Sequence, residues 1–432
     1  MITTIKKIGI NGEGIGYYKK KPVFIDDCLP DEIVEFEIKE EKEKYIIGNK
    51  IKLVKTSDKR IKAKCYYYDY CGGCQLMHTD YRNQLVIKRD FLAQTLEKYA
   101  KLNPKIIGKL NGSKHEFYYR NELKLPVRMF MGKLVTGMYL KGSNSLKRVN
   151  NCIVHEKLLE RVKDRVLDCL NECRIKAYDG KNRQGLRYII LRGFGGNYQL
   201  QLIFGNKSAN NLLIGALAKI AEIKSIYFSY NTNSDPLINK TEAIKVYGED
   251  KLLLEIDGYK FMVSMEAFVQ LNLTQAVNIF HYIGSLIKPG DVLVEEYCGI
   301  GIMSTLYHKK FKKIYASELN SISIDDFNYN LSLNGIDNIE TKASDAYLHL
   351  KSIKGDIDYL LVDPPRSGLD HRIINEILKK NIKNIIYMSC SPSSLAKNID
   401  ALKHKYRVIS VEVFDMFPNT SYVESVVLLT RK

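Results

Sequence analysis

The stretch Val292–Gly301, with the sequence VLVEEYCGIG, decides how the second half of the chain is interpreted. It begins as a short apolar run rich in β-branched residues, typical of a buried strand, and continues into a Gly-x-Gly turn. Glycines at such a turn let the backbone approach a ligand closely. From about residue 264 onward, strands of this kind alternate with helical patterns. That alternation predicts a parallel sheet with helices on its faces and a ligand site at the carboxyl ends of its strands.

Acidic residues follow three further strands of this region. The run Ile314–Glu318 ends in an acid, Asp345 follows another strand region, and Asp363 follows the apolar run Tyr359–Val362. A carboxylate at a strand end can accept hydrogen bonds from the hydroxyls of a ribose. The spacing therefore fits a nucleoside cofactor. The three-glycine dinucleotide fingerprint is absent, which favours S-adenosylmethionine over NAD.

Cys390 comes just after the predicted strand Asn384–Met388, where open α/β sheets place their chemistry. Glu424 is a late carboxylate that comes after the segment Asp415–Pro418. Taken alone, Cys390 could be a buried structural thiol and Glu424 a surface carboxylate. A thiol, a carboxylate and a cofactor acid at neighbouring strand ends instead indicate a nucleophile, a base and a cofactor edge.

Three further cysteines lie within ten residues, at Cys65, Cys71 and Cys74. The two glycines between Cys71 and Cys74 allow a tight turn that faces both thiolates toward one centre. Cys152 is the nearest candidate for a fourth ligand. Four thiolates suit zinc or an iron–sulfur cluster equally by ligand count. The alternative is three unrelated buried thiols, although clustered cysteines in an intracellular chain favour metal binding.

The positive charge of the 432-residue chain is concentrated in its middle. The net charge is +17, and residues 61–263 carry 34 Lys and Arg against 19 Asp and Glu, whereas residues 264–432 carry 19 of each. A basic segment of this kind favours a polyanion, most simply a nucleic acid. No apolar run has membrane-spanning length, and the first residues do not resemble a signal peptide. We therefore expect a soluble cytoplasmic protein.

The first half of the chain has a different pattern from the second half. Residues 1–56 show short strands with turn signals, which predict a small β-barrel. Beyond the cysteine loop, an apolar face predicts a helix over residues 81–99. The predicted elements of the following region are strands at 187–192 and 198–203 and helices near 155–172 and 208–222.

The chain resembles the bacterial RNA uracil-5 methyltransferases that use S-adenosylmethionine, and the resemblance runs nearly end to end. It rests above all on two motifs, Ser389-Cys390-x-Pro392 and Phe417-Pro418-x-Thr420-x-x-Val423-Glu424. In addition, Phe268–Asn272 matches a Phe-x-Gln-x-Asn segment of the family. The resemblance implies a nucleophile at Cys390 and a base at Glu424. It also implies cofactor-binding residues, which are Gln270, Tyr297, Glu318, Asp345 and Asp363. Four cysteines match the positions that hold a [4Fe–4S] cluster in the 23S ribosomal RNA branch of the family; they are Cys65, Cys71, Cys74 and Cys152.

The domain organisation expected from this resemblance is a multidomain α/β protein. Residues 1–56 would form a TRAM-like or OB-like β-barrel, and residues 57–257 a central α+β domain with the iron–sulfur cluster. Residues 258–432 would form a Rossmann-like class I methyltransferase domain, on which the helix at about 81–100 packs. Arg120 and Asn121, in the basic middle segment, are candidates for RNA contacts.

Several positions depart from the family pattern. Glu295 and Glu296 stand where the family has Asp and an apolar residue, and Ile302 replaces a polar residue. Ser391 replaces an Asn, and Tyr422 replaces a His. None of these changes removes a predicted catalytic group.

The expected reaction is methylation of carbon 5 of a uridine in 23S ribosomal RNA through a covalent bond between Cys390 and carbon 6. The partner is therefore RNA, with no membrane and no obligate protein partner. The alternatives are the same reaction on transfer RNA, amine methylation and a non-catalytic RNA-binding protein. In the amine class an aromatic residue follows the Asp-Pro-Pro motif, whereas here Arg366 follows it, and that chemistry needs no Cys390.

Overall fold

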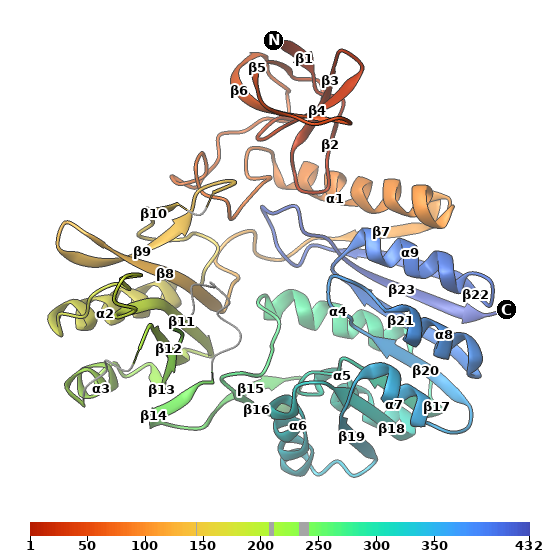
Figure 1. Cartoon of the computed structure of the whole chain (residues 1–432). Helices are drawn as coiled ribbons and strands as arrows, with labels where there is room; N and C mark the ends of the chain where they lie inside the picture. Colours follow the sequence, from red (N-terminus) through yellow and green to blue (C-terminus); the bar gives the residue numbers. More distant parts are fainter. Residues whose placement is uncertain (144, 207–210, 233–241) are drawn as a thin grey trace. The chain divides into compact units, whose positions relative to one another are not determined.

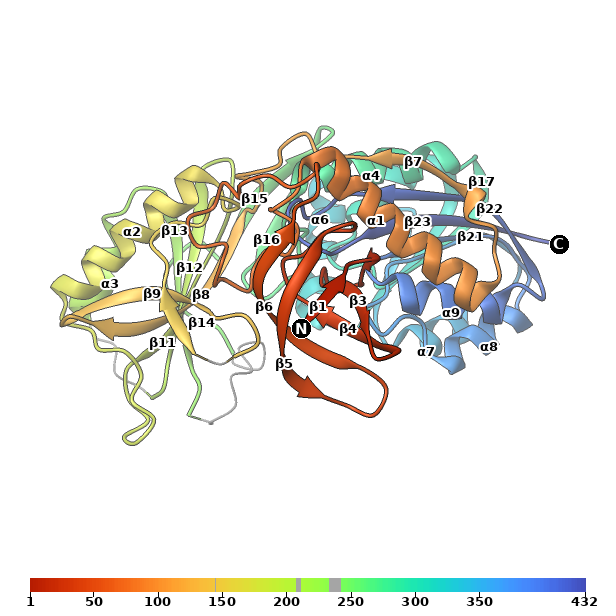
Figure 2. The same cartoon turned by 90° about the horizontal axis from the view of Figure 1, so that it is seen from above.

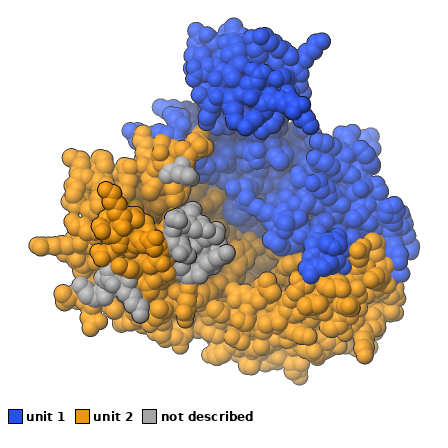
Figure 3. All heavy atoms as spheres, viewed as in Figure 1, with its two compact units in different colours: residues 1–116, 364–374, 387–432 blue, residues 117–363, 375–386 orange. Residues whose placement is uncertain are grey.

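The computed structural model describes residues 1–143, 145–206, 211–232 and 242–432 of the chain. The chain divides into two compact units (Figure 3). Unit 1 comprises residues 1–116, 364–374 and 387–432, and unit 2 comprises residues 117–363 and 375–386. Helix α8 (His371–Lys379) and strand β21 (Ile382–Ser389) contribute residues to both units. None of the helices in the described ranges is both long and apolar enough to cross a membrane.

The N-terminal part of unit 1 is a six-stranded sheet in the order β1-β5-β6-β4-β3-β2. Its fully buried interior includes Val23 of β4 and Phe36 of β5, together with Ile5, which lies between β1 and β2. Along β5 apolar and polar residues alternate, so that Val34 and Phe36 point into this core. The strands are β1 (Ile2–Thr4), β2 (Lys7–Ile8), β3 (Gly14–Tyr18), β4 (Lys21–Ile25), β5 (Ile33–Glu41) and β6 (Ile46–Lys55).

The rest of unit 1 combines two long helices with part of a sheet in the order β23-β22-β7. Helix α1 begins at the N-cap Asp80, whose side chain accepts a hydrogen bond from the amide of Asn83. The helix and its π-helical extension η1 pack against α9, as Figure 2 shows. The elements are α1 (Tyr81–Thr95), η1 (Leu96–Ala100), η2 (Pro104–Ile106), β7 (Ile107–Asn111), α9 (Pro392–Leu402), β22 (Tyr406–Phe414) and β23 (Glu424–Arg431).

Unit 2 begins with a seven-stranded mixed sheet in the order β10-β9-β8-β11-β12-β13-β14. Two helices, α2 and α3, cover one face of this sheet (Figure 1), and Val162 and Leu217 of these helices are buried in its core. The predicted strands and the predicted helix at 155–172 are present. The first three residues of the predicted helix at 208–222 lie outside the described residues. The elements are β8 (Glu122–Phe130), β9 (Lys133–Tyr139), β10 (Leu146–Arg148), α2 (Lys157–Glu172), β11 (Leu186–Phe194), β12 (Asn197–Phe204), α3 (Asn211–Ala218), β13 (Ile223–Tyr230) and β14 (Ile244–Gly248).

The second part of unit 2 contains the parallel sheet that the sequence predicts, in the order β19-β18-β17-β20. Strand β17 pairs in parallel with β18 on one side and with β20 on the other. The strand order therefore reverses at β17, and in such sheets the ligand crevice lies at the carboxyl ends of the strands beside the reversal. The elements are β15 (Lys251–Ile256), β16 (Tyr259–Ser264), α4 (Leu273–Leu286), β17 (Gly290–Glu296), α5 (Ile302–Tyr307), η4 (His308–Lys310), β18 (Phe311–Glu318), α6 (Ser321–Asn334), β19 (Ile339–Ala343), α7 (Ala346–Ser352) and β20 (Ile357–Val362).

Candidate active site

The turn after β17 is shaped for close approach to a ligand. Tyr297, Gly299 and Gly301 all have positive φ values, at +64°, +55° and +76°. A side chain at Gly301 would meet the ring of Phe327 at 2.1 Å, so only glycine fits there. Among the described residues, a Cβ at Gly299 would have only one atom within 4 Å, the Phe268 carbonyl oxygen 3.9 Å away. The backbone at Gly299 therefore borders open space.

Two predicted cofactor acids occupy the ends of neighbouring strands. Glu318 closes β18, and its carboxylate accepts hydrogen bonds from the amides of Leu319 and Asn320, at 2.8 and 3.0 Å, and from that of Gly299 at 3.3 Å. These bonds hold the carboxylate at the Gly-x-Gly turn. Asp345 follows β19 and caps helix α7, because its Oδ1 accepts from the amides at the start of that helix. Both acids lie at carboxyl ends of strands, as predicted.

The loop that carries Gln270 is fixed by a buried asparagine. The Asn121 side-chain amide donates to the Gln270 carbonyl at 3.1 Å, and the Asn121 backbone amide donates to the Leu271 carbonyl at 3.1 Å. Asn121 is only 2% exposed. The prediction that Asn121 contacts RNA is therefore wrong, because its side chain is buried and supports the loop of a predicted cofactor residue.

A small pocket of about 50 Å³ joins these parts of unit 2. Gln270, Tyr297 and Asp363 line it together with Glu295, which sequence comparison marks only as a departure from the family pattern. Sites for small molecules usually enclose 300–1,000 Å³. A nucleoside cofactor would therefore extend beyond this pocket along the strand ends, where Glu318 and Asp345 lie. The pocket residues, with Glu318 and Asp345, fit such a cofactor because they offer hydrogen-bonding groups beside the strand at which the sheet order reverses.

Two carboxyl groups in this pocket hold their protons unusually tightly. Glu295 is fully buried, and burial raises its pKa to about 8, an effect to which the neighbouring Asp363 adds. Burial also raises the pKa of Asp363 to about 7. Ser304 donates a hydrogen bond to Glu295 Oε2, whereas Oε1 has no hydrogen-bond partner among the described residues. A buried polar atom without a partner is costly, so Oε1 is a natural acceptor or donor for a ligand.

Replacing Glu295 with glutamine is expected to stabilise the ligand-free protein as the pH rises. The pKa of Glu295 is about 8 in the folded protein against an ordinary value of 4.5. Between pH 4.5 and pH 8 this carboxyl group ionises in the unfolded chain but not in the folded one, so the free energy of unfolding falls, by about 5 kcal/mol in total at pH 9. The thermal midpoint of Glu295→Gln should exceed that of the parent increasingly from pH 5 to pH 9.

The control for this experiment is Glu340→Gln, which changes an exposed carboxylate on β19. Its midpoint should follow that of the parent at every pH. A Glu295→Gln variant that is less stable than the parent at pH 9 would mean that Glu295 is ionised in the fold.

Cys390 lies at the junction between β21 and α9 in unit 1. Pro392 is the first residue of α9, and its ring is compatible with this position because no intrahelical hydrogen bond is needed there. The Ser389 and Ser391 side chains close the turn around the cysteine through hydrogen bonds to the backbone and to Ser394. Cys390 therefore lies two residues before the first residue of α9, at the end of the helix where the dipole is positive.

Arg366 is a member of this site that sequence reasoning did not assign. Its guanidinium lies 4.3 Å from the centre of the Tyr422 ring. The pKa of Arg366 is raised, mainly by a hydrogen bond to Tyr422 and to a smaller extent by its interaction with Cys390. A guanidinium beside a thiol stabilises the thiolate. The available signal was the arginine that directly follows the Asp-Pro-Pro motif.

Glu424 is the first residue of β23, where it is 4% exposed and pairs with Phe414 of β22. The loop before it turns at Asn419, which has a positive φ of +69°. The Gln84 side chain of α1 holds this turn through two hydrogen bonds, since it accepts from the Asn419 amide at 2.9 Å and donates to Asn419 Oδ1 at 3.2 Å.

A second contact from α1 is made by Lys88, one turn further along the helix. Its ammonium group donates to Asp415 at 2.5 Å and to the Phe417 carbonyl at 2.9 Å. Helix α1 thus positions the loop that leads to Glu424.

The same turn is also bound by the cysteine loop. The amides of Gln75 and Leu76, which directly follow Cys74, both donate to the Asn419 carbonyl at 3.0 Å. The Gln75 side chain in addition accepts from the Ser421 amide at 3.3 Å. The cysteine loop and the loop of the predicted base therefore form one connected network of hydrogen bonds within unit 1.

Truncating Gln84 to alanine is expected to lower kcat about tenfold, because the loop that leads to Glu424, the predicted base, loses its positioning contacts. The KM for the methyl donor should not change, since the predicted cofactor residues lie elsewhere. The share of enzyme trapped as the predicted covalent adduct with RNA should rise, because only the predicted proton-removal step is slowed. Glu97→Ala, an exposed change on η1, is the control. If Gln84→Ala lowers kcat without any rise in the share of covalent adduct, the role of Gln84 is purely structural.

The four cysteines of the predicted metal site are divided between the two units. The amide of Gly73 donates to Cys71 Sγ at 3.4 Å, and burial, with a further contribution from nearby Cys71, raises the pKa of Cys65. Cys152 belongs to unit 2, whereas the other three cysteines belong to unit 1. Across the described parts of the chain, no group of three or more histidine, cysteine or acidic side chains is close enough to hold a metal ion. The donor type suits a thiolate-bound metal, and the three cysteines of unit 1 lie on one short loop.

Comparison with known proteins identifies the class of enzyme. A family model described as tRNA (Uracil-5-)-methyltransferase matches residues 80–432, and a TRAM domain model matches residues 3–51. The chain therefore belongs to the tRNA (uracil-5-)-methyltransferase family and carries an N-terminal TRAM domain. It is an RNA methyltransferase, as its curated relatives are.

The relatives extend over the whole chain. A protein of Listeria innocua described as an uncharacterized RNA methyltransferase is 33% identical over 446 residues, which cover 99% of this chain and 97% of the relative. A similarly described protein of Bacillus anthracis is 33% identical over 442 residues, with 99% and 96% covered. The crystal structure of Pyrococcus abyssi tRNA (uracil-54, C5)-methyltransferase in complex with S-adenosyl-L-homocysteine has a TM-score of 0.79 and 22% identity, with all of both chains covered. That likeness establishes the methyltransferase fold.

Proposed function

We propose that this protein transfers a methyl group from S-adenosylmethionine to carbon 5 of a uridine in 23S ribosomal RNA. The observation that carries the proposal is the setting of Cys390, which lies between a strand end and a helix N-terminus with the Arg366 guanidinium beside it. Such a setting activates a thiol as a nucleophile. The family membership and the cofactor-like pocket in unit 2 support the same reaction.

The reaction begins with the Cys390 thiolate, which adds to carbon 6 of the uracil ring. Carbon 5 of free uracil is too weak a nucleophile to accept a methyl group, and this addition converts the ring to an enolate that is nucleophilic at carbon 5. S-adenosylmethionine, when bound, supplies the methyl group as an electrophilic carbon. Glu424 then removes the hydrogen that remains on carbon 5, and the thiolate leaves. The uridine has to be unstacked to reach these groups.

The residues of unit 2 would bind the methyl donor. Gln270, Tyr297 and Asp363 line the pocket. Glu318, at the end of β18, would accept hydrogen bonds from the ribose hydroxyls, and Asp345 follows the next strand, β19. Protonated Glu295 would offer a hydrogen-bond donor at neutral pH, which an ionised carboxylate does not.

We further propose that Cys65, Cys71, Cys74 and Cys152 bind a [4Fe–4S] cluster. Four thiolates are the ligand set of such clusters, and three of them come from one short glycine-containing loop. Protein purified without oxygen should contain about four iron and four sulfide per chain and absorb broadly near 400 nm. Cys71→Ser should lose the iron. Bound zinc in colourless wild-type protein would contradict the assignment.

The same reaction on transfer RNA is the second candidate, because the matching family model and the similar solved structure are both named for transfer RNA. The experiment that separates the two is mass-spectrometric mapping of 5-methyluridine in ribosomal and transfer RNA from cells with and without this protein. A methyl group that disappears from 23S ribosomal RNA alone supports the first target, and one lost from transfer RNA alone supports the second. An unchanged map, together with no transfer to either RNA in vitro, would overturn the proposed function.

A further inference from the structure

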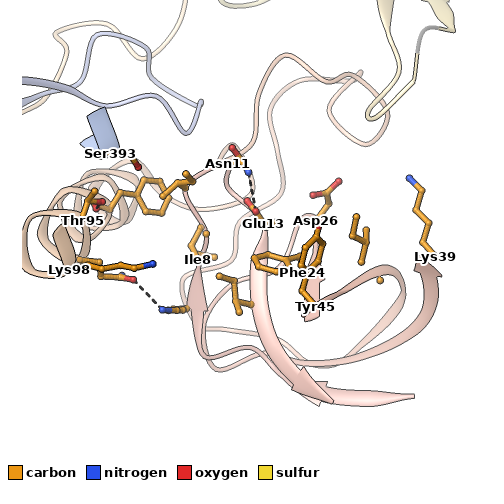
Figure 4. A pocket seen from close by; sticks show the side chains of 18 of the residues that line it. Ile8, Asn11, Glu13, Phe24, Asp26, Lys39, Tyr45, Thr95, Lys98 and Ser393 are labelled. Atoms are coloured by element: carbon orange, nitrogen blue, oxygen red, sulfur yellow. Dashed lines mark hydrogen bonds between the residues drawn. The ribbon is translucent and has the colours of Figure 1, made fainter. Parts of the chain in front are cut away.

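A cavity of about 680 Å³ in unit 1 has no role in the function proposed above (Figure 4). One wall is the six-stranded N-terminal sheet, the region for which the sequence predicts a barrel and which is called the barrel below. It contributes residues of β2, β3, β4, β5 and β6. The other wall is formed by α1 and η1, with Ser393 of α9. The Lys7 ammonium group of the barrel donates to the Gln94 side chain of α1 at 3.4 Å, which connects the two walls. The volume lies within the range of small-molecule sites.

Aromatic rings lie at both ends of this cavity. Phe24 and Tyr45 are on the barrel side, with ring centres 5.6 Å apart and planes nearly perpendicular. Tyr45 is 37% exposed although it is a large ring. Tyr99 lines the helix side. Exposed rings in a basic groove are the feature on which unpaired nucleic-acid bases stack.

Basic groups accompany the rings. Lys39 lies on the barrel side and Lys98 on the helix side, and both are exposed. The Lys98 ammonium lies 4.9 Å from the centre of the Tyr99 ring, and the Lys397 ammonium of α9 lies 5.5 Å from the same ring. The cavity therefore offers cations at both ends, as the phosphates on either side of one nucleotide require.

Two carboxyl groups lie near the barrel rings. Asp26 follows β4 and is exposed, and Glu13 lies beside it, with its carboxylate held by the Asn11 side-chain amide at 3.2 Å. A carboxylate accepts hydrogen bonds from the exocyclic amino group of cytosine. It repels carbonyl oxygens, because these can only accept hydrogen bonds. Uracil has no amino group, and its single N–H is flanked by two carbonyl oxygens. The barrel end therefore suits a base other than uracil.

We propose that this cavity binds one unpaired nucleotide of the RNA substrate, distinct from the uridine that is methylated and carrying a base with an amino group. The base stacks on Phe24 and Tyr45 beside Asp26, and its phosphates lie near Lys39 and Lys98. The inference rests on the proposed function in that RNA is the substrate. An acidic peptide would use the lysines, but it would meet repulsion from Asp26 and leave the rings without a stacking partner.

The test measures binding of labelled ten-nucleotide RNAs, oligo(A), oligo(C) and oligo(U), to the full chain by fluorescence anisotropy. Oligo(A) and oligo(C) should bind at least about fivefold more tightly than oligo(U). Tyr45→Ala and Lys98→Gln should each weaken binding of oligo(A) and oligo(C) about tenfold. Asp26→Asn should reduce the preference over oligo(U). The control is Tyr17→Ala, an exposed tyrosine of the same barrel that does not line the cavity, which should bind as the parent does.

Ultraviolet crosslinking of oligo(C) should modify peptides that contain Tyr45 or Tyr99. Unchanged affinity in both Tyr45→Ala and Lys98→Gln, or crosslinks confined to other peptides, would overturn the proposal. An acidic peptide of ten glutamates that competes with oligo(A) for Tyr45-dependent binding would also overturn it.

Methyl transfer separates this inference from the proposed function. If the function holds, Tyr45→Ala should raise the KM for RNA about tenfold with kcat unchanged. Methyl transfer with an unchanged KM would reject the cavity site and keep the function. Oligonucleotide binding that depends on Tyr45, in a protein that transfers no methyl group, would keep the site and reject the function.

Discussion

Replacing Cys390 with alanine is expected to lower methyl transfer at least about 10⁴-fold, because a nucleophile that forms a covalent intermediate has no substitute in the site. The variant should still bind RNA, and its thermal midpoint should lie close to that of the parent, since the side chain is partly exposed at the end of β21. The measurement is incorporation of labelled methyl groups into RNA.

The matched control for this variant is Cys173→Ala. Cys173 is a partly exposed cysteine at the end of α2, outside every predicted site. Its activity should equal that of the parent. Substantial methyl transfer by Cys390→Ala would refute the covalent route.

Replacing Glu424 with glutamine is expected to trap the enzyme on its RNA. The thiolate can still add and the methyl group can still be accepted, but the hydrogen on carbon 5 is no longer removed, so the thiolate cannot leave. Turnover should fall about 10²- to 10⁴-fold, as is usual when a catalytic base is lost. Glutamine has nearly the shape of glutamate, so this almost fully buried position should tolerate the change.

The trapped species is detected as a protein–RNA band that survives denaturing electrophoresis and contains the transferred methyl group. The double variant with Cys390→Ala is the control, and it should form no such band. A Glu424→Gln enzyme that neither accumulates an adduct nor loses turnover would show that another group removes the proton.

The parallel sheet of unit 2 could be predicted because its signals are local. An apolar run such as Val292–Glu296 followed by Gly-x-Gly specifies a strand and a turn without reference to the rest of the chain. The positions of Glu318 and Asp363 at strand ends follow from the same local pattern, because parallel strands bring their carboxyl ends to one edge.

The roles of several other residues could not be predicted in this way. Asn121 follows a basic residue in a basic region, and its sequence position suggests an RNA contact, yet tertiary packing buries it under the Gln270 loop. Glu295 looked only like a departure from the family pattern. Its high pKa comes from complete burial beside Asp363, and burial is a property of the assembled fold.

The sequence by itself determined the class of this protein, the alternation of strands and helices, and the motifs around Cys390 and Glu424, since these depend on residues near one another along the chain. Only the tertiary structure decided how the loop before Glu424 is held. Gln84 and Asn419 are 335 positions apart, and no periodicity or spacing connects them. The same holds for the cavity between the barrel and α1, whose walls come from separate segments. Contacts between distant segments form only when hydrophobic burial closes the chain into units, so their partners are defined by packing and not by local pattern.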